Sequence, residues 1–164
     1  MIRAVCIDIE STGFSTALHE AWEVACVTLD ARGLVLDEWS AAWEPVKADR
    51  DPRALAVNRF EERAADRTAD RGQAIEELLL RLTGAEVVSY GLLDRRMVAE
   101  LLGGMPWLVW VDLLPLARRA LPHLRAHRLC DVAAACDADP GEAHRALDDA
   151  RTLAAVYRRL LVSP

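Results

Sequence analysis

The chain has 164 residues, enough for one domain with a sizeable core, and we expect residues 1–164 to form a single domain. Hydrophobic residues make up 52% and charged residues 28% of it. This balance excludes a disordered chain, which would lack the apolar surface that offsets the entropy of ordering. The formal net charge is −6, so the protein has no general basic field to hold duplex nucleic acid through its phosphates.

Cysteine spacing and hydropathy indicate the compartment. The four cysteines are Cys6, Cys26, Cys130 and Cys136. No pair of them has a Cys-x-x-Cys or zinc-site spacing, and we interpret them as buried thiols of a reducing compartment. No apolar run approaches the roughly 18 residues of a membrane span, and acidic residues interrupt the N-terminal run where a signal peptide has its apolar core. We therefore expect a cytoplasmic protein with no membrane segment.

The first third of the chain predicts three strands. Residues 2–9 are apolar except for Arg3 and Asp8 and are rich in β-branched side chains, which is typical of a central strand covered on both faces. Residues 23–30 and 34–43 read as two strands joined by a turn at 30–33, and we expect them to pair antiparallel. The segment 45–72 has nearly balanced charge, and we expect a solvated connection with one short helix around 53–58.

Helices and strands alternate over the rest of the chain. Apolar residues recur at helical spacing from Ile75 to Leu82, before Gly84. We then expect a strand over 86–90, a helix over 94–102, a strand over 107–111, a helix capped by Asp112 and ended by Pro122, and helices over 129–136 and 146–161. This order predicts an α/β fold, a mixed five-stranded sheet flanked by helices.

Two acids share one face at the end of the first strand. Residues two apart on a strand point to the same side, so Asp8 and Glu10 lie together. Their charges repel in a low-dielectric setting unless a cation neutralises them, which favours a metal site. Acids are also common where a strand leaves the core, and the pair alone leaves both interpretations open.

The last predicted helix carries a further acid toward the core. Asp149 shares an apolar stripe with Leu153, Val156 and Leu160, whereas Asp148 falls on the more polar side. A carboxylate on an apolar face is costly unless it is paired or binds a metal ion. We expect Asp149 to be the functional acid and Asp148 to be solvated or salt-bridged.

Asp94 and His144 are less specific when each is taken alone. Asp94 starts an apolar helical stripe, but Asp is also a favoured N-cap residue, and that role is slightly preferred without other evidence. His144 can face the same point as Asp149 only if it lies in a loop before the helix, which Pro140 and Gly141 favour. A single loop histidine is otherwise typical of an ordinary surface.

Together these residues resemble a known family over nearly the whole chain. The run from Asp8 to Gly13, Asp94 before a helix, and the run from His144 to Ala150 are similar to the three motifs of the DEDDh 3′-to-5′ exonucleases, which include the proofreading subunit of bacterial replicative polymerase. The Glu23 strand, residues 54–58 and residues 127–129 also resemble the family in order and distance. The second motif differs, because residues 89–90 read Ser-Tyr and residues 93–94 read Leu-Asp where the family usually has His-Asn and Phe-Asp.

The resemblance implies a fold, a site and a reaction. It implies an RNase H-like fold with Asp8, Glu10, Asp94 and Asp149 as ligands of two divalent ions, Mg²⁺ or Mn²⁺, and with His144 as general base. These five residues are the catalytic set. The expected reaction is hydrolysis of single-stranded 3′ ends of DNA to nucleoside monophosphates. The expected substrate-side residues are Ser11, Thr12, Gly13, Phe14 and Asn58.

Other functions and weaker signals remain open. One alternative is an exoribonuclease of short RNA or RNA tails, and another is a catalytically silent module that binds nucleic acid or a polymerase. A polymerase partner is possible in either case, and the sequence leaves the oligomeric state undefined. Phe14 could stack on a base or pack in the core, and Asn58 could be a loop or cap residue.

Other aromatic and histidine residues have simpler interpretations. The tryptophans fall mainly in strand-like runs and are expected to be buried. They are Trp22, Trp39, Trp43, Trp107 and Trp110. His123 and His127 have metal-pair spacing but are expected to lie at an exposed helix end.

Overall fold

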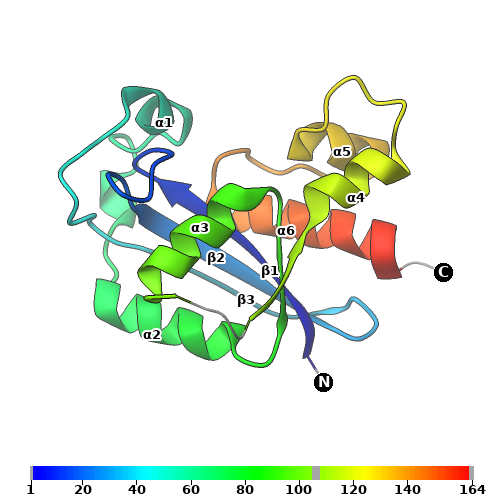
Figure 1. Cartoon of the computed structure of the whole chain (residues 1–164), viewed down its shortest axis with the longest axis horizontal. Coiled ribbons are helices and arrows are strands. Elements are labelled where there is room, and N and C mark those ends of the chain that lie inside the picture. The colour runs from blue at the N-terminus through cyan, green and yellow to red at the C-terminus, as the bar shows by residue number, and fades with distance from the viewer. Residues whose placement is uncertain (1, 105–107, 163–164) are drawn as a thin grey trace.

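The computed structural model describes residues 2–104 and 108–162, with side chains described over 4–104 and 108–161. Five strands form one sheet in the order β3-β2-β1-β4-β5 (Figure 1). β1 pairs antiparallel with β2 and parallel with β4, so the mixed five-stranded sheet with a central first strand is confirmed. The strands are β1 (Ile2–Ser11), β2 (Ala21–Asp30), β3 (Val35–Ala42), β4 (Glu86–Ser89) and β5 (Val109–Asp112). Trp107, where the last strand was expected to begin, lies outside the described residues.

The turn between β2 and β3 has the predicted position and a clear local cause. The Asp30 carboxylate accepts hydrogen bonds from the backbone N–H groups of Arg32 and Leu34, both at 2.8 Å. Gly33 has a φ of 78°, a left-handed conformation that costs glycine little. β2 and β3 then pair antiparallel as expected.

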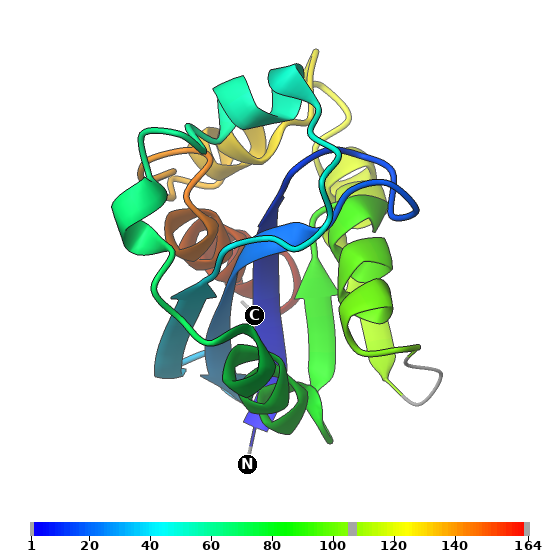
Figure 2. The same cartoon turned by 90° about the vertical axis from the view of Figure 1, so that its left-hand side faces the viewer.

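Helices cover both faces of the sheet (Figures 1 and 2). On one face, α2 (Arg71–Leu82) and α3 (Leu92–Leu101) pack with Leu78, Leu82 and Met97 against strand residues such as Ile7 and Val87. On the other face lie α4 (Leu113–Ala120), α5 (Leu129–Ala135) and α6 (Ala146–Tyr157). The two buried layers confirm the α/β architecture.

Two helix boundaries differ from the expected ones. The α-helical part of α6 ends at Tyr157 and a π-helical turn, η2 (Arg158–Val162), follows where a continuous helix was expected. The helix expected at 94–102 begins two residues earlier, because Gly91 occupies the N-cap position of α3. By contrast, Asp112 caps α4 as predicted, and its carboxylate accepts a hydrogen bond from the N–H of Leu114.

The segment from Pro45 to Gly72 is more structured than a solvated connection. It contains α1 (Pro52–Val57) and a 3-10 turn, η1 (Ala64–Asp66). Phe60 and Arg63 are buried in it and both contact Trp22, with a T-shaped ring pair at 5.2 Å and a guanidinium 4.8 Å from the ring centroid. The expected short helix is confirmed as α1. The expectation of a solvated connection was wrong because it treated every charge of the segment as solvated, whereas Arg63 pairs with Glu23 inside the fold.

The outer strand β3 is anchored by charges on both of its sides. Val35 and Leu36 are exposed, and the two residues that follow them are acidic. Asp37 pairs with Arg81 of α2, and Glu38 pairs with Arg151 of α6 at 2.6 Å. Helices from opposite faces of the sheet therefore hold this strand.

Most predictions of burial are confirmed, with one correction. Trp22 and Trp43 are fully buried, and Trp39 and Trp110 are half-buried. Cys6, Cys26 and Cys136 are buried, but the prediction was wrong for Cys130, which is partly exposed. Among the described residues no helix combines the length and hydropathy that a membrane crossing requires.

Candidate active site

A cavity of about 570 Å³ opens where β1 ends, between α3, α5 and the loop that precedes α6. Figure 2 shows how α1 and the loops gather over this end of the sheet. The five residues expected to form the catalytic set all line this one cavity: Asp8, Glu10, Asp94, His144 and Asp149. The fold therefore brings together side chains from three parts of the chain that are far apart in the sequence.

The end of β1 supplies the first two acids. Alternation along the strand gives Asp8 and Glu10 the same side, while Ile7 and Ile9 belong to the core on the other face. Glu10 is buried, with only 8% of the residue exposed. The strand that carries these two carboxylates is itself held in the sheet, because β1 pairs with β2 on one side and with β4 on the other.

Asp94 enters the cavity from the first turn of α3. It is the third residue of the helix rather than its N-cap, so the interpretation of Asp94 as a cap is wrong. The backbone N–H groups of Ile9 and of Asp94 itself lie near its carboxylate and lower its pKa, against the larger effect of burial. The start of α3 therefore places this acid at the same cavity as Asp8 and Glu10.

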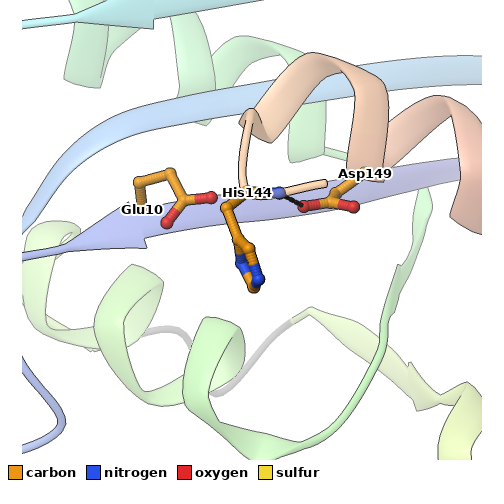
Figure 3. Close-up of side chains that lie close together, drawn as sticks. All are labelled: Glu10, His144 and Asp149. Atoms are coloured by element: carbon orange, nitrogen blue, oxygen red, sulfur yellow. Dashed lines mark hydrogen bonds between the residues drawn. The ribbon is translucent and has the colours of Figure 1, made fainter. Parts of the chain in front are cut away.

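His144 lies in the loop before α6, where its proposed role needs it. Its backbone is left-handed, with a φ of 64°, and its N–H donates a 2.7 Å hydrogen bond to Oδ2 of Asp149. Potential ligand atoms of Glu10, His144 and Asp149 lie within 4.8 Å of one another (Figure 3). Asp148 instead pairs with Arg151 at 3.1 Å, as expected for the outward acid.

The four carboxyl groups strongly perturb one another. Burial, followed by the charges of Glu23 and Asp149, raises the pKa of Glu10 to about 8. Burial likewise raises the pKa of Asp94 to about 7. Burial, followed by the charges of Asp94, Glu10 and Asp149, holds the pKa of Asp8 well above its usual range. The pKa of Asp149 is also raised, chiefly by burial.

This donor set fits divalent cations. Four carboxylates gather at one cavity, and the arginine that lines it, Arg128, forms an ion pair with Asp131 at 2.8 Å. Hard oxygen donors of this kind suit Mg²⁺ or Mn²⁺. A bound cation would also favour the ionised form of each carboxyl group and so offset the repulsion that raises their pKa values.

The expected substrate-side residues divide into two groups. Ser11 and Phe14 line the cavity, and the Phe14 side chain is exposed, with a residue exposure of 54%. Thr12, Gly13 and Asn58 lie outside the cavity lining: Oγ1 of Thr12 accepts a hydrogen bond from Glu20 N–H at 3.2 Å, and Nδ2 of Asn58 donates to the Ser11 carbonyl at 2.9 Å. These three residues support the cavity wall, and substrate contacts at all five positions stay predictions.

Gly13 is required by a close approach in the loop after β1. A Cβ atom at this position would lie 2.4 Å from Nδ1 of His19. The same nitrogen accepts a hydrogen bond from the Ser15 N–H at 3.2 Å. The loop that presents Phe14 is therefore folded tightly on His19.

The altered second motif has its own hydrogen bonds. The Ser89 hydroxyl donates to the Gly91 carbonyl and accepts from the Trp110 indole, both at 2.9 Å. Tyr90 lines the cavity, and its hydroxyl donates to the His127 carbonyl at 2.8 Å. His127 lies in the loop after α4, and its ring Nε2 is 3.0 Å from the Leu121 carbonyl. The expected helix end at His123 and His127 is thus a loop.

Three features of the site were missing from the sequence predictions. They are the lining residues Arg128 and Cys130 and the buried ion pair between Glu23 and Arg63. Glu23 lies directly opposite Glu10 in the β1–β2 register. The available signal in the sequence was this single acid in an otherwise apolar stretch of the predicted strand. Residues 127–129 resemble the family in order and distance, but this resemblance does not show that Arg128 and Cys130 line the cavity.

The comparisons with known proteins agree with this arrangement. The sequence profile of the family described as "Exonuclease" matches residues 5–157. Among solved structures, a zinc-bound form of E. coli exonuclease I with single-stranded DNA has a TM-score of 0.79 and 18% identity, covering 96% of this chain and 40% of that one. An exonuclease I from Methylocaldum szegediense has a TM-score of 0.75 and 16% identity, with 96% and 40% coverage.

A shorter relative matches almost end to end. The nuclease domain of 3′hExo, described as a DEDDh family member and bound to rAMP, has a TM-score of 0.75 and 18% identity and covers 96% of this chain and 90% of that one. The chain spans about two fifths of the exonuclease I structures it matches. The comparison with curated protein sequences gives no match. The profile match confirms the resemblance that the motifs indicated: the chain belongs to the exonuclease family and has its RNase H-like fold.

Proposed function

We propose that this protein removes nucleotides from single-stranded 3′ ends of DNA, releasing nucleoside monophosphates, with two divalent ions and His144 as general base. The observation that carries the proposal is the convergence of Asp8, Glu10, Asp94, Asp149 and His144 on one cavity. A solely structural role does not account for four acids with raised pKa values placed around a shared space.

In the proposed reaction, the four acids and His144 would have different roles. Asp8, Glu10, Asp94 and Asp149 would hold the ions, which when bound activate the attacking water and stabilise the leaving oxygen. His144 takes the proton of that water as its oxygen attacks the terminal phosphorus. The bond from phosphorus to the 3′ oxygen of the penultimate nucleotide breaks, and that oxygen takes up a proton from a solvent water molecule as it leaves.

The position of Phe14 supports a single-stranded end as substrate. Its exposed ring lies at the cavity wall, and a base can stack on an aromatic face without regard to its sequence. The protein is acidic overall, so binding would depend on the ions and on local contacts rather than on a long basic groove.

The direct test uses a 5′-labelled oligonucleotide with an unpaired 3′ end, incubated with the purified protein and Mg²⁺ or Mn²⁺. We expect a ladder that shortens from the 3′ end, nucleoside monophosphates as product, and no product in EDTA. The Asp8→Ala and Asp149→Ala variants should be inactive, which also excludes a contaminating nuclease. A folded wild-type protein with no ladder would contradict the proposal.

RNA is the nearest alternative substrate, because the 3′hExo nuclease domain, which this chain resembles in fold, was bound to rAMP. Matched ribo- and deoxyribo-oligonucleotides of one sequence separate the two. We expect a higher kcat/KM on the deoxyribo-oligonucleotide. A clear preference for the ribo-oligonucleotide would reassign the substrate while leaving the site intact.

A further inference from the structure

Two buried acids face each other where the candidate metal site meets the sheet. Glu10 and Glu23 are directly opposed in the antiparallel register of β1 and β2. Opposed side chains share a face of the sheet and have Cβ atoms about 5 Å apart. Both residues are buried, at 8% and 7% exposure. Like charges in this position destabilise a sheet unless a cation lies beside them.

Arg63 is that cation. Its Nη2 lies 2.5 Å from Oε1 of Glu23 and its Nε lies 3.1 Å from Oδ2 of Asp66. The Arg63 side chain is 8% exposed and its guanidinium stacks 4.8 Å from the Trp22 ring centroid. Two ion pairs and the contact with the Trp22 ring therefore hold the arginine next to the pair of acids.

The ion pair is incompletely satisfied. Among the described residues, Nη1 of Arg63 and Oε2 of Glu23 are buried and have no hydrogen-bond partner. A guanidinium has a planar fork of donors and binds carboxylates through two of them where it can. Arg63 thus keeps Nη1 as a donor for a carboxylate besides Glu23 and Asp66. Glu10 is the acid directly opposite Glu23 in the strand pair.

We propose that Glu23 is a positioning residue. Its ion pair with Arg63 keeps the guanidinium from binding Glu10, so that the Glu10 carboxylate is free to bind a divalent ion. The proposal rests on the metal site of the proposed function. If Glu23 lost its charge, Arg63 would be a buried cation paired only with the half-exposed Asp66. The Glu10 carboxylate would then be its nearest buried counter-charge, and an arginine bound to Glu10 competes with the ion for the same oxygens.

The test measures Mn²⁺ binding to the full chain by isothermal titration calorimetry, with no nucleic acid present. Glu23→Gln should weaken Mn²⁺ binding about tenfold, the usual scale for a residue that supports a metal ligand. The double variant Glu23→Gln with Arg63→Gln removes the competing cation and should recover most of the lost affinity. A residue needed only for folding gives no such recovery, because the second substitution would add to the damage.

Glu77→Gln is the matched control. It also removes one carboxylate from an ion pair, the one with Arg81 at 2.9 Å, but Glu77 lies on α2 and its side chain is 44% exposed. Its Mn²⁺ affinity should stay close to that of the wild type, since solvent and salt screen exposed charges.

The Mn²⁺ affinities of the Glu23 variants decide whether Glu23 positions the metal ligand. Unchanged Mn²⁺ affinity in Glu23→Gln, or a double variant weaker than the single one, overturns the role of Glu23. If Glu23→Gln does not fold, Glu23→Asp keeps the charge but withdraws it by one methylene, and we expect an intermediate loss of affinity; wild-type affinity there overturns the proposal as well. A wild-type protein that binds no Mn²⁺ would instead contradict the proposed metal site.

Discussion

The backbone N–H of His144 donates a 2.7 Å hydrogen bond to Oδ2 of Asp149. One carboxylate oxygen therefore holds the histidine loop in place, and the same group lines the cavity of the proposed metal site. Asp149 therefore has two roles to separate, its hydrogen bond to the loop and its proposed binding of a metal ion. Substitutions that keep the acceptor oxygen but remove the charge separate the two roles.

Asp149→Asn should retain the loop and lose the chemistry. Its amide oxygen can still accept from His144 N–H, but it lacks the negative charge that favours a cation. We expect no detectable nuclease activity and strongly weakened Mn²⁺ binding, with a melting temperature at or above that of the wild type. Asp149→Ala also leaves the His144 N–H without its acceptor and should be about 1 kcal/mol less stable than Asp149→Asn. Activity assays and denaturant titrations check both.

His144→Asn should slow turnover while leaving the ion site occupied. Asparagine tolerates the left-handed backbone of this position, where φ is 64°. Loss of a general base lowers kcat by about 10² to 10⁴. We expect Mn²⁺ affinity, measured by calorimetry, to remain close to the wild-type value. A kcat within about twofold of wild type, far less than the loss of a general base causes, would remove His144 from the reaction.

The stability of the metal-free protein should fall as pH rises. In the folded protein, burial and neighbouring charges raise the pKa of Glu10 from about 4.5 to about 8 and that of Asp94 from about 3.8 to about 7. A group whose pKa is raised by folding contributes stability below its unfolded pKa and loses it as pH passes the folded value. In EDTA we expect the melting temperature to decrease between about pH 4 and pH 8.

Divalent ions should reverse that trend. Mn²⁺ binds the ionised carboxylates, so the rise in melting temperature on adding it should grow with pH over the same window. Differential scanning fluorimetry at several pH values checks both effects. Glu10→Gln with Asp94→Asn should flatten the metal-free profile, and a wild-type profile that rises with pH would contradict the assignment of these two groups.

Phe14→Ala should weaken substrate binding more than chemistry. Stacking of a base on an aromatic ring contributes about 1 to 3 kcal/mol, so we expect KM for a short oligonucleotide to rise about tenfold with a smaller change in kcat. Phe14→Tyr keeps the ring and is the matched control. Unaltered KM in the alanine variant would assign the exposed ring to another purpose.

Tyr90→Phe should act on stability alone. The lost hydroxyl donates to the His127 carbonyl, and a hydrogen bond of this kind contributes about 1 kcal/mol. The ring that lines the cavity remains, so kcat/KM should change little. Urea denaturation and steady-state kinetics measure the two quantities, and a large drop in kcat would give the hydroxyl a part in the reaction.

Local patterns predicted the parts of the fold that local forces determine. The turn at Asp30 to Gly33, the capping of α4 by Asp112 and the inward direction of Asp149 all follow from spacing and from short-range hydrogen bonds. The central place of the first strand followed from its mostly apolar, β-branched residues, which indicate a strand covered on both faces. These features need no knowledge of distant contacts.

Features that depend on residues far away in the chain could not be predicted from the sequence. Arg63 looks like a solvated charge until Glu23, forty residues earlier, pairs with it. Asp94 looks like a helix cap because only the fold shows Gly91 taking that position and the Ile9 N–H reaching the carboxylate. Cys130 is partly exposed because it lies in the first turn of α5 and lines the cavity. In each case a tertiary contact overrides the local preference.

The anchored outer strand has a consequence for solubility. An edge strand with two exposed apolar residues, Val35 and Leu36, is a template on which other chains can add. Asp37 and Glu38 follow at once, and arginines from opposite faces hold their carboxylates in place. The acidic pair thus acts as a gatekeeper against intermolecular sheet growth, and replacing both acids by valine would turn this border into an aggregation site.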